Sequence, residues 1–421
     1  MNIDLFNQLG DEIEAAWLAA DYNEERLPEI ARAALERADI PSKTDPWEAV
    51  AWAMEQRELP AQFDVFGRFG EPPITLYRAP RFHIDIYFWF TSTTTLHQHA
   101  FCGAFQVFAG SSLHSWYEFE RDHTINRFAE TGKLDLKVSH VLTKGMVQEI
   151  WPGGRYIHGL FHLDEPSVTI VVRTNRGLLE PPQYDYYKPG LAVDPTFDSE
   201  IVTKKMQLAH ALLRAKRPEA DAAIDTLFRS SDLHTSFILL SSFRDGLQAN
   251  ALETMFGVTR GADRFARLLD IVEERHGEPA QILRSVFEFR ALQDHHVHYR
   301  RIVSEPEHRF FYALLLNLDN REQILNVIRD RYPDEDAVDK ILDWVYDLAN
   351  TRVAGSDDTN ALGVPAFGQI EMYALEGLLR GKADDDIVAN YAAESANADA
   401  AAIPAALEKL RSSLTFRPLL A

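Results

Sequence analysis

The stretch TTLHQHAFCGAFQVFAG, residues 94–110, decides how the fold is interpreted. It places His97 and His99 two residues apart, ahead of a run of apolar and small residues. Alternate side chains of a β-strand point to the same face, so both imidazoles can approach one point while Gln98 faces away. The pair leaves two alternatives open: a metal site that needs a further ligand from elsewhere, or two polar residues on an ordinary strand.

The hydrophobic pattern around this stretch is that of β-strands, from about residue 63 to residue 190. In RFHIDIYFWF, residues 81–90, apolar side chains occupy every second position, which predicts a strand with one apolar face. Further strand candidates are AFQVFAG, HSWYEFE, KLDLKVSHVL, GMVQEIW and SVTIVVRT, and Gly, Ser, Asp and Pro separate them at short spacing. This region is therefore predicted to form an antiparallel barrel or sandwich.

Helical periodicity replaces the strand pattern on both sides. Residues 1–62 contain DEIEAAWLAA, ERLPEIARAALERA and TDPWEAVAWAMEQ, and in the last of these Thr44 or Asp45 can cap a helix with Pro46 in its first turn. Residues 195–421 read as an all-α domain, expected to cover the mouth of the barrel or to make a homodimer contact. The fold class is thus α+β.

The clearest C-terminal helix is PDEDAVDKILDWVYDLA, which has one apolar stripe made by Val338, Ile341, Leu342, Val345 and Leu348. Further helices are expected at 199–215, 262–275, 279–292, 307–317 and 367–379, and a last one in NADAAAIPAALEKL. The segment 353–368 is expected to be a long loop.

Composition limits the class of function. The apolar fraction of 46% and the charged fraction of 25% are those of a folded protein. A formal net charge of −21 argues against a nucleic-acid surface, and no apolar run reaches the roughly 20 residues that span a bilayer. With a single cysteine, Cys102, and no secretory leader pattern, we expect a cytoplasmic protein that acts on a small molecule, with no nucleic acid or membrane as partner.

A second histidine segment lies about fifty residues after the first. In KGMVQEIWPGGRYIHGLFHL, residues 144–163, the turn WPGG precedes His158 and His162. Eight of the fifteen histidines lie between residues 83 and 162, and clustered imidazoles favour a transition metal over calcium or magnesium. Either His158 or His162 can supply the third ligand, and spacing alone does not separate them.

The two histidine segments resemble the two sequence motifs of the cupin superfamily. For the first motif, G-x5-H-x-H-x3,4-E-x6-G, the chain has His97-x-His99-x3-Gly103-x6-Gly110, with glycine at the glutamate position. For the second, G-x5-P-x-G-x2-H-x3-N, it has Gly145-x6-Pro152-x-Gly154-x3-His158-x3-His162. The resemblance implies a single cupin barrel, a double-stranded β-helix, with His97, His99 and His158 as metal ligands.

A three-histidine cupin site without the carboxylate resembles the thiol dioxygenases, the cysteine dioxygenase group. The resemblance implies Fe(II), with Zn, Mn or Ni as other divalent metals, and dioxygenation of a small acidic or thiol substrate. His162 would support a ligand or replace one, Arg81 or Arg173 would pair with a substrate carboxylate, and Tyr87 would line the pocket.

Three alternatives stay open beside that reading. The barrel could be a non-catalytic ligand-binding or regulatory module, or a metal-dependent isomerase or lyase. A competing constellation is QDHHVHYRR, residues 293–301, in which His295 and His298 would share a helix face with Asp294 and Glu288. Cys102 is expected to be a buried apolar residue rather than a nucleophile.

Overall fold

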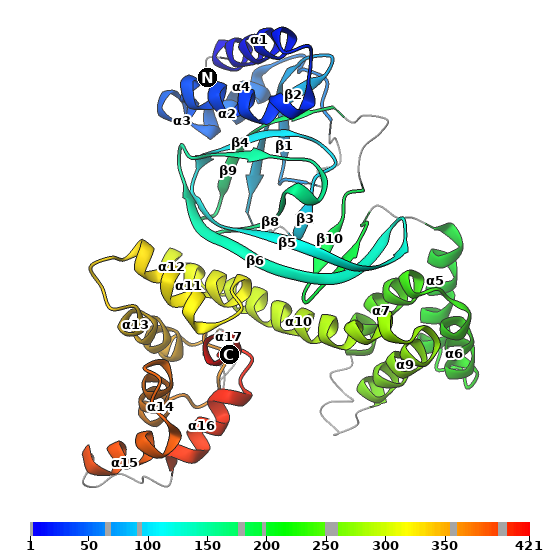
Figure 1. The fold of residues 1–421 in the computed structure, drawn as a ribbon, viewed down its shortest axis with the longest axis vertical. Coiled ribbons are helices and arrows are strands. Elements are labelled where there is room, and N and C mark those ends of the chain that lie inside the picture. Colours follow the sequence, from blue (N-terminus) through cyan, green and yellow to red (C-terminus); the bar gives the residue numbers. More distant parts are fainter. Residues whose placement is uncertain are drawn as a thin grey trace.

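The computed structural model describes residues 3–63, 69–90, 95–175, 182–195, 199–248, 260–353, 360–394 and 402–421. Helices come first along the chain, strands follow, and helices fill the remainder (Figure 1). The first helices are α1 (Asp4–Ala19), α2 (Leu27–Ala38), α3 (Ile40–Lys43) and α4 (Pro46–Glu55), with a short 3-10 turn, η1 (Glu24–Arg26), before α2. Of the two cap candidates for α4, Asp45 does the capping, since its side chain accepts from the backbone N–H of Trp47 at 2.8 Å.

A five-stranded antiparallel sheet packs against these helices. Its order is β1 (Pro73–Arg78), β2 (Phe82–Trp89), β9 (Ser167–Thr174), β4 (Gly103–Ala109) and β7 (Val147–Ile150). The alternation predicted for β2 is confirmed: Phe82, Ile84, Ile86 and Phe88 share a buried cluster with residues of α1 and α2. The other face of β2 is therefore left for the interior of the strand region.

Six further strands form a closed antiparallel barrel. Their order is β10 (Asp185–Tyr187), β11 (Leu191–Val193), β6 (Ala129–Thr143), β5 (Ser111–Asn126), β8 (Ile157–His162) and β3 (Leu96–Gln98), and β3 pairs with β10 to close the ring. β5 and β6 extend well beyond the segments predicted for them. β3 and β8 are neighbours, and a second 3-10 turn, η2 (Gly153–Arg155), leads from β7 into β8.

The C-terminal region is helical. Its described helices are α5 (Glu200–Arg214), α6 (Ala220–Ser230), α7 (Leu233–Gln248), α9 (Arg260–His276), α10 (Glu278–Arg300), α11 (Pro306–Asn317), α12 (Arg321–Arg331), α13 (Ala337–Asn350), α14 (Gln369–Leu379), α15 (Asp384–Glu394), α16 (Ala402–Ser412) and α17 (Arg417–Leu420). α10 continues to Arg300 instead of ending at 292, because residues 293–300 contain no proline or glycine to stop it. Within the expected loop 353–368, residues 354–359 lie outside the described residues.

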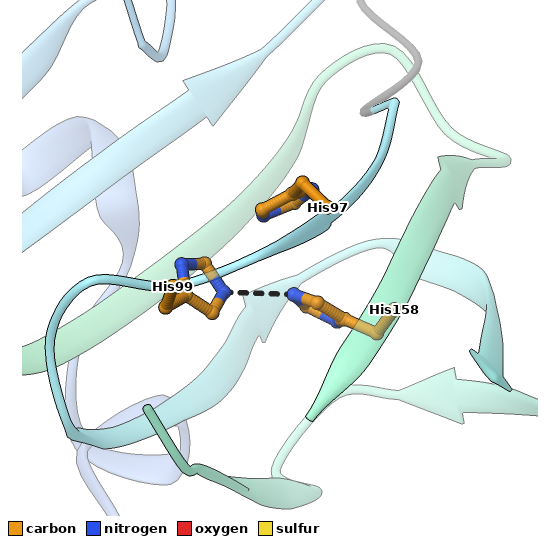
Figure 2. A group of neighbouring side chains, drawn as sticks. All are labelled: His97, His99 and His158. Carbon is orange, nitrogen blue, oxygen red and sulfur yellow. Dashed lines mark hydrogen bonds between the residues drawn. The ribbon is translucent and has the colours of Figure 1, made fainter. Parts of the chain in front are cut away.

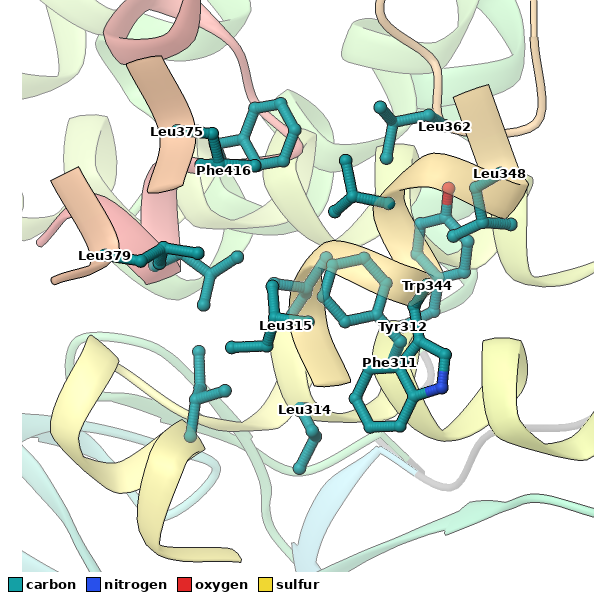
Figure 3. Packing of buried hydrophobic residues seen from close by; sticks show 14 of the residues in the cluster. Phe311, Tyr312, Leu314, Leu315, Trp344, Leu348, Leu362, Leu375, Leu379 and Phe416 are labelled. Atoms are coloured by element: carbon teal, nitrogen blue, oxygen red, sulfur yellow. The ribbon is translucent and has the colours of Figure 1, made fainter. Parts of the chain in front are cut away.

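The second large core lies in this helical region and reaches the barrel. α11 is buried on several sides, and Phe311, Tyr312, Leu314 and Leu315 pack with residues of α13, α14 and the C-terminal end (Figure 3). The predicted α13 stripe is confirmed: four of its five residues are buried, and Leu342 packs beside them. Leu113 of β5 and Phe161 of β8 belong to the same cluster, so these helices pack on the outer surface of the barrel.

Among the described residues, no helix has both the length and the apolar character needed to cross a bilayer.

Candidate metal centre

Strand pairing brings the two histidine segments together. β3 and β8 run antiparallel, and His97 is the direct partner of His158 in their register. His99 follows β3 and forms a bridge with Pro152, and the backbone N–H of Gly153 donates to the carbonyl of His99 at 2.8 Å. The WPGG turn thus docks onto the first histidine segment, and the three imidazoles face one another (Figure 2).

The spacing of the imidazole nitrogens suits one metal ion. One ligand atom from each of His97, His99 and His158 can be chosen so that all lie within 4.8 Å of one another. The Nε2 atoms of His99 and His158 are 2.9 Å apart and share a hydrogen bond. Two nitrogens bound at 2.0–2.1 Å to a tetrahedral ion lie about 3.3 Å apart, so small side-chain adjustments reach that geometry. The three residues could therefore bind a metal.

Burial keeps these imidazoles in the form that binds metals. All three are at most 4% exposed. Burial lowers the pKa of His97, and it lowers the pKa of His99 and of His158 well below the ordinary histidine value, with further lowering by neighbouring charges. A neutral imidazole offers one nitrogen lone pair, which is what a metal ion requires.

The hydrogen bonds around the group also fit a metal. Nδ1 of His97 donates to the carbonyl of Thr95 at 2.7 Å, which fixes the tautomer and leaves the Nε2 lone pair of His97 free for a ligand bond. That Nε2 is buried and has no hydrogen-bond partner among the described residues. Within the described part of the chain, this is the one group of three or more histidine, cysteine or carboxylate side chains with such spacing.

The glycine at the glutamate position of the first cupin motif has a steric cause. A Cβ at Gly103 would lie 1.9 Å from the carbonyl oxygen of Val172 on β9, which is far inside contact distance. Gly103 pairs with both Ile150 and Arg173, so this backbone is held between two strands. No side chain can be built at position 103 without moving a strand, and the site is limited to imidazole ligands from these segments.

The three histidines are part of the lining of a small apolar cavity. Its volume is about 30 Å³, enough for about two water molecules. The aromatic walls are Phe69, Tyr87, Trp89, Phe101 and Phe105. Three aliphatic residues and Thr169 complete the lining. The mostly apolar lining therefore favours a small ligand with an apolar remainder.

A buried polar row borders the cavity on the inner face of β2. Tyr87 donates its hydroxyl to Asp85 Oδ2 at 2.9 Å and accepts from Arg173 Nη1 at 3.4 Å, while His83 Nε2 lies 3.3 Å from the same Asp85 oxygen. Burial raises the pKa of Tyr87, so the residue remains a neutral phenol. Although burial opposes it, interactions with His83 hold the pKa of Asp85 below its ordinary value. Tyr87 thus links the carboxylate of Asp85 to the guanidinium of Arg173.

The two candidate arginines occupy different places. The Arg173 guanidinium lies 3.7 Å from the ring centre of Phe101. Phe101 lines the cavity and Arg173 does not, so Arg173 lies beside the cavity wall without forming part of it. Arg81 is exposed and lies over the ring of Tyr22 at 4.3 Å, against the N-terminal helices. The structure therefore does not bring Arg81 to the three histidines.

His162 faces the interior but stands apart from the group. It lies four positions after His158 along the strand, a distance of about 13 Å. Its Nδ1 hydrogen-bonds with the hydroxyl of Ser112 at 2.9 Å, and its ring stacks on Trp89 with centres 4.9 Å apart. Burial, and then the charge of Arg300, lower the pKa of His162 to about 3. The geometry thus groups His158 with His97 and His99, and it uses His162 to support a cavity wall.

Two other sequence candidates have structural roles. Cys102 is buried among apolar residues, and burial raises the pKa of its thiol to about 12, as expected for a residue that is not a nucleophile. In the segment QDHHVHYRR, Asp294 pairs with Arg244 and His295 hydrogen-bonds with Thr415 at 2.8 Å. These contacts occupy Asp294 and His295, and the segment forms no group of three metal-binding side chains among the described residues.

Three residues near the centre were not predicted from the sequence. Tyr156 packs against the ring of His158 at 4.3 Å and shares a hydrogen bond with His114 Nε2 at 3.0 Å. Tyr156 could have been found, because it stands two residues before His158 and so shares its face. His114 and Phe69 come from segments whose partners the sequence does not reveal.

No family model and no curated protein sequence matches the chain. Among solved structures, one described as "Crystal structures of DMSP lyases RdDddP and RnDddQII" aligns at 17% sequence identity over 36% of this chain and 74% of that chain, with a TM-score of 0.22. An alignment with so low a TM-score carries no argument about fold or function. The closed barrel and the three-histidine group fit the cupin resemblance on their own.

Proposed function

We propose that the chain is a metal-dependent enzyme of the cupin type, with His97, His99 and His158 as the metal ligands. The observation that carries the proposal is the meeting of three buried, neutral imidazoles in the wall of an apolar cavity. A structural metal site is closed by four protein ligands, whereas three leave room for a substrate. The apolar walls beside the histidines supply the water-poor surroundings that such chemistry uses.

For the reaction, we propose Fe(II)-dependent dioxygenation of a small acidic or thiol substrate. Three neutral ligands leave the 2+ charge of the ion uncompensated, which favours a thiolate or carboxylate as a further donor. When bound, iron would supply the activation of dioxygen. The resemblance to the thiol dioxygenases, based on the missing carboxylate at Gly103, supports this choice of metal.

The remaining residues would shape the site. Tyr87 lines the cavity, and because its proton is held by Asp85, its oxygen offers a lone pair to a substrate donor group. Arg173 would hold Tyr87 in this orientation and contribute positive potential through the Phe101 wall. His162 would hold the Trp89 ring in place.

Oxygen uptake by iron-loaded protein tests the proposal. The protein is purified anaerobically, its metal content is measured, and oxygen consumption is followed with a panel of small thiols and carboxylates. We expect uptake with at least one substrate, loss of uptake in His158→Ala, and retention of the metal in the matched variant His162→Ala. Substrate conversion without oxygen uptake would favour the isomerase or lyase alternative. Metal binding with no conversion of any compound would favour a ligand-binding module.

A further inference from the structure

Phe69 is the part of the cavity wall that faces solvent. Of the twelve described residues that line the cavity, eleven are buried and Phe69 alone is partly exposed. Its ring meets Tyr87, Trp89 and His97 edge to face, with ring centres 5.6, 5.1 and 6.2 Å away. A ligand that reaches the three histidines from this side must therefore pass the Phe69 ring.

The backbone that carries Phe69 is tied to β2. Gly70 has a φ of +87°, and a Cβ there would lie 3.2 Å from Cδ1 of Tyr87, so the chain passes close to that ring. The backbone N–H of Glu71 then donates to the carbonyl of Phe88 at 2.7 Å. Each edge-to-face ring contact stabilises this position further. Phe69 is thus held over the cavity by its own contacts and by the backbone that follows it.

The small volume of the cavity limits which ligands fit beside the Phe69 ring. With the Phe69 ring in place, the volume is about 30 Å³. A dry apolar cavity of about 150 Å³ is large enough to bind benzene, whereas one of about two water volumes has no room for a ring. Replacing Phe69 by alanine removes one six-membered ring from the wall beside His97.

We propose that Phe69 determines the size of the ligand that reaches the metal. Ligands of about two water volumes fit beside the histidines with the ring in place. Ring-sized ligands are excluded by Phe69 and are admitted when its side chain is shortened. This inference rests on the metal site of the proposed function, and it adds that the substrate class is limited to compact molecules by one residue.

Cobalt-loaded full-length protein provides the test, because the visible spectrum of Co(II) reports a change in its ligands independently of any reaction. Azide serves as the compact probe and imidazole as the ring-sized probe. The variants are Phe69→Ala and Phe69→Leu, with Phe63→Ala as matched control. Phe63 is 42% exposed, stacks on His83 and does not line the cavity. Circular dichroism establishes that each variant keeps its fold.

We expect azide to change the cobalt spectrum of all four proteins with similar Kd. Imidazole is expected to bind Phe69→Ala with a Kd lower by about tenfold or more than in the wild type, equivalent to 1.4 kcal/mol or more. Phe69→Leu should lie between them, and Phe63→Ala should match the wild type. Equal imidazole affinity in wild type and Phe69→Ala, with cobalt bound in both, would overturn the role of Phe69. Failure of the wild-type protein to bind cobalt would overturn the metal site, and the inference with it.

Discussion

Replacing Arg300 should weaken the junction between the barrel and the C-terminal helices. Arg300 ends α10, is 1% exposed, and donates from Nη2 to the carbonyl of His162 at 2.7 Å. Its Nη1 lies 3.7 Å from Glu165, which also pairs with Arg309 at 2.8 Å. The two arginines thus contact the end of β8 and the turn between β8 and β9. β8 also carries His158, the third histidine of the site.

Arg300→Met keeps much of the side-chain volume and removes the charge and the donors. A hydrogen bond from a charged donor contributes about 1.5–3 kcal/mol, and a buried carbonyl left without a partner costs a similar amount. Glu165 is 36% exposed and keeps its ion pair with Arg309 in the variant. The free-energy penalty for leaving a buried charge without a partner is therefore small for Glu165. The desolvation of Arg300 itself, which lowers its pKa, offsets part of the loss. We expect a net destabilisation of about 2–3 kcal/mol.

Urea unfolding, followed in parallel by tryptophan fluorescence and far-UV circular dichroism, measures this loss. The matched control is Arg301→Met, which makes the same change at the next residue, where the side chain is exposed. A surface change of this kind stays within about 0.5 kcal/mol of the wild type. Should Arg300→Met and Arg301→Met unfold at the same urea concentration, the buried contact contributes nothing, and the reasoning is refuted.

Three further changes test separate parts of the structure. Gly103→Ala should yield little folded protein, because the new Cβ would meet the Val172 carbonyl at 1.9 Å; soluble expression with native circular dichroism would contradict this. His296→Leu should make the protein less sensitive to acid. Burial lowers the folded-state pKa of His296 to about 3, so the free energy of unfolding of the wild type falls as pH drops below about 6.5, by about 2 kcal/mol at pH 5. Urea titrations at pH 7.5 and pH 5 should show that the variant loses about 2 kcal/mol less than the wild type. Tyr87→Phe should cost about 1.5–3 kcal/mol in the same assay, because the charged acceptor Asp85 loses the hydrogen bond that the Tyr87 hydroxyl donates, and an unchanged midpoint would argue against the polar row.

The strand region could be predicted from local pattern because its two faces have opposite character. The alternation in residues 81–90 predicted a strand, and its apolar positions do pack against the N-terminal helices. The spacing of His97 and His99 predicted that they share a face, and they do. Such predictions depend only on the period of the chain and on burial, and both can be read within one element.

Contacts between distant segments could not be predicted in this way. The choice between His158 and His162 depends on the register of β3 against β8, which pairs His97 with His158. Phe69 lines the cavity but belongs to a segment with no strand pattern. Arg173 packs on Phe101, which lies about seventy residues earlier in the chain.

Metal content provides the most direct test of the central claim, that His97, His99 and His158 form one metal site. Wild-type protein and the double variant His97→Ala/His99→Ala are loaded with Fe(II) anaerobically, freed of excess metal by gel filtration, and analysed for iron per chain. Both histidines lie inside the strand region, so circular dichroism should show that the C-terminal helices remain folded in the variant. We predict one iron per wild-type chain and none in the variant. Full iron content in a folded double variant would contradict the account.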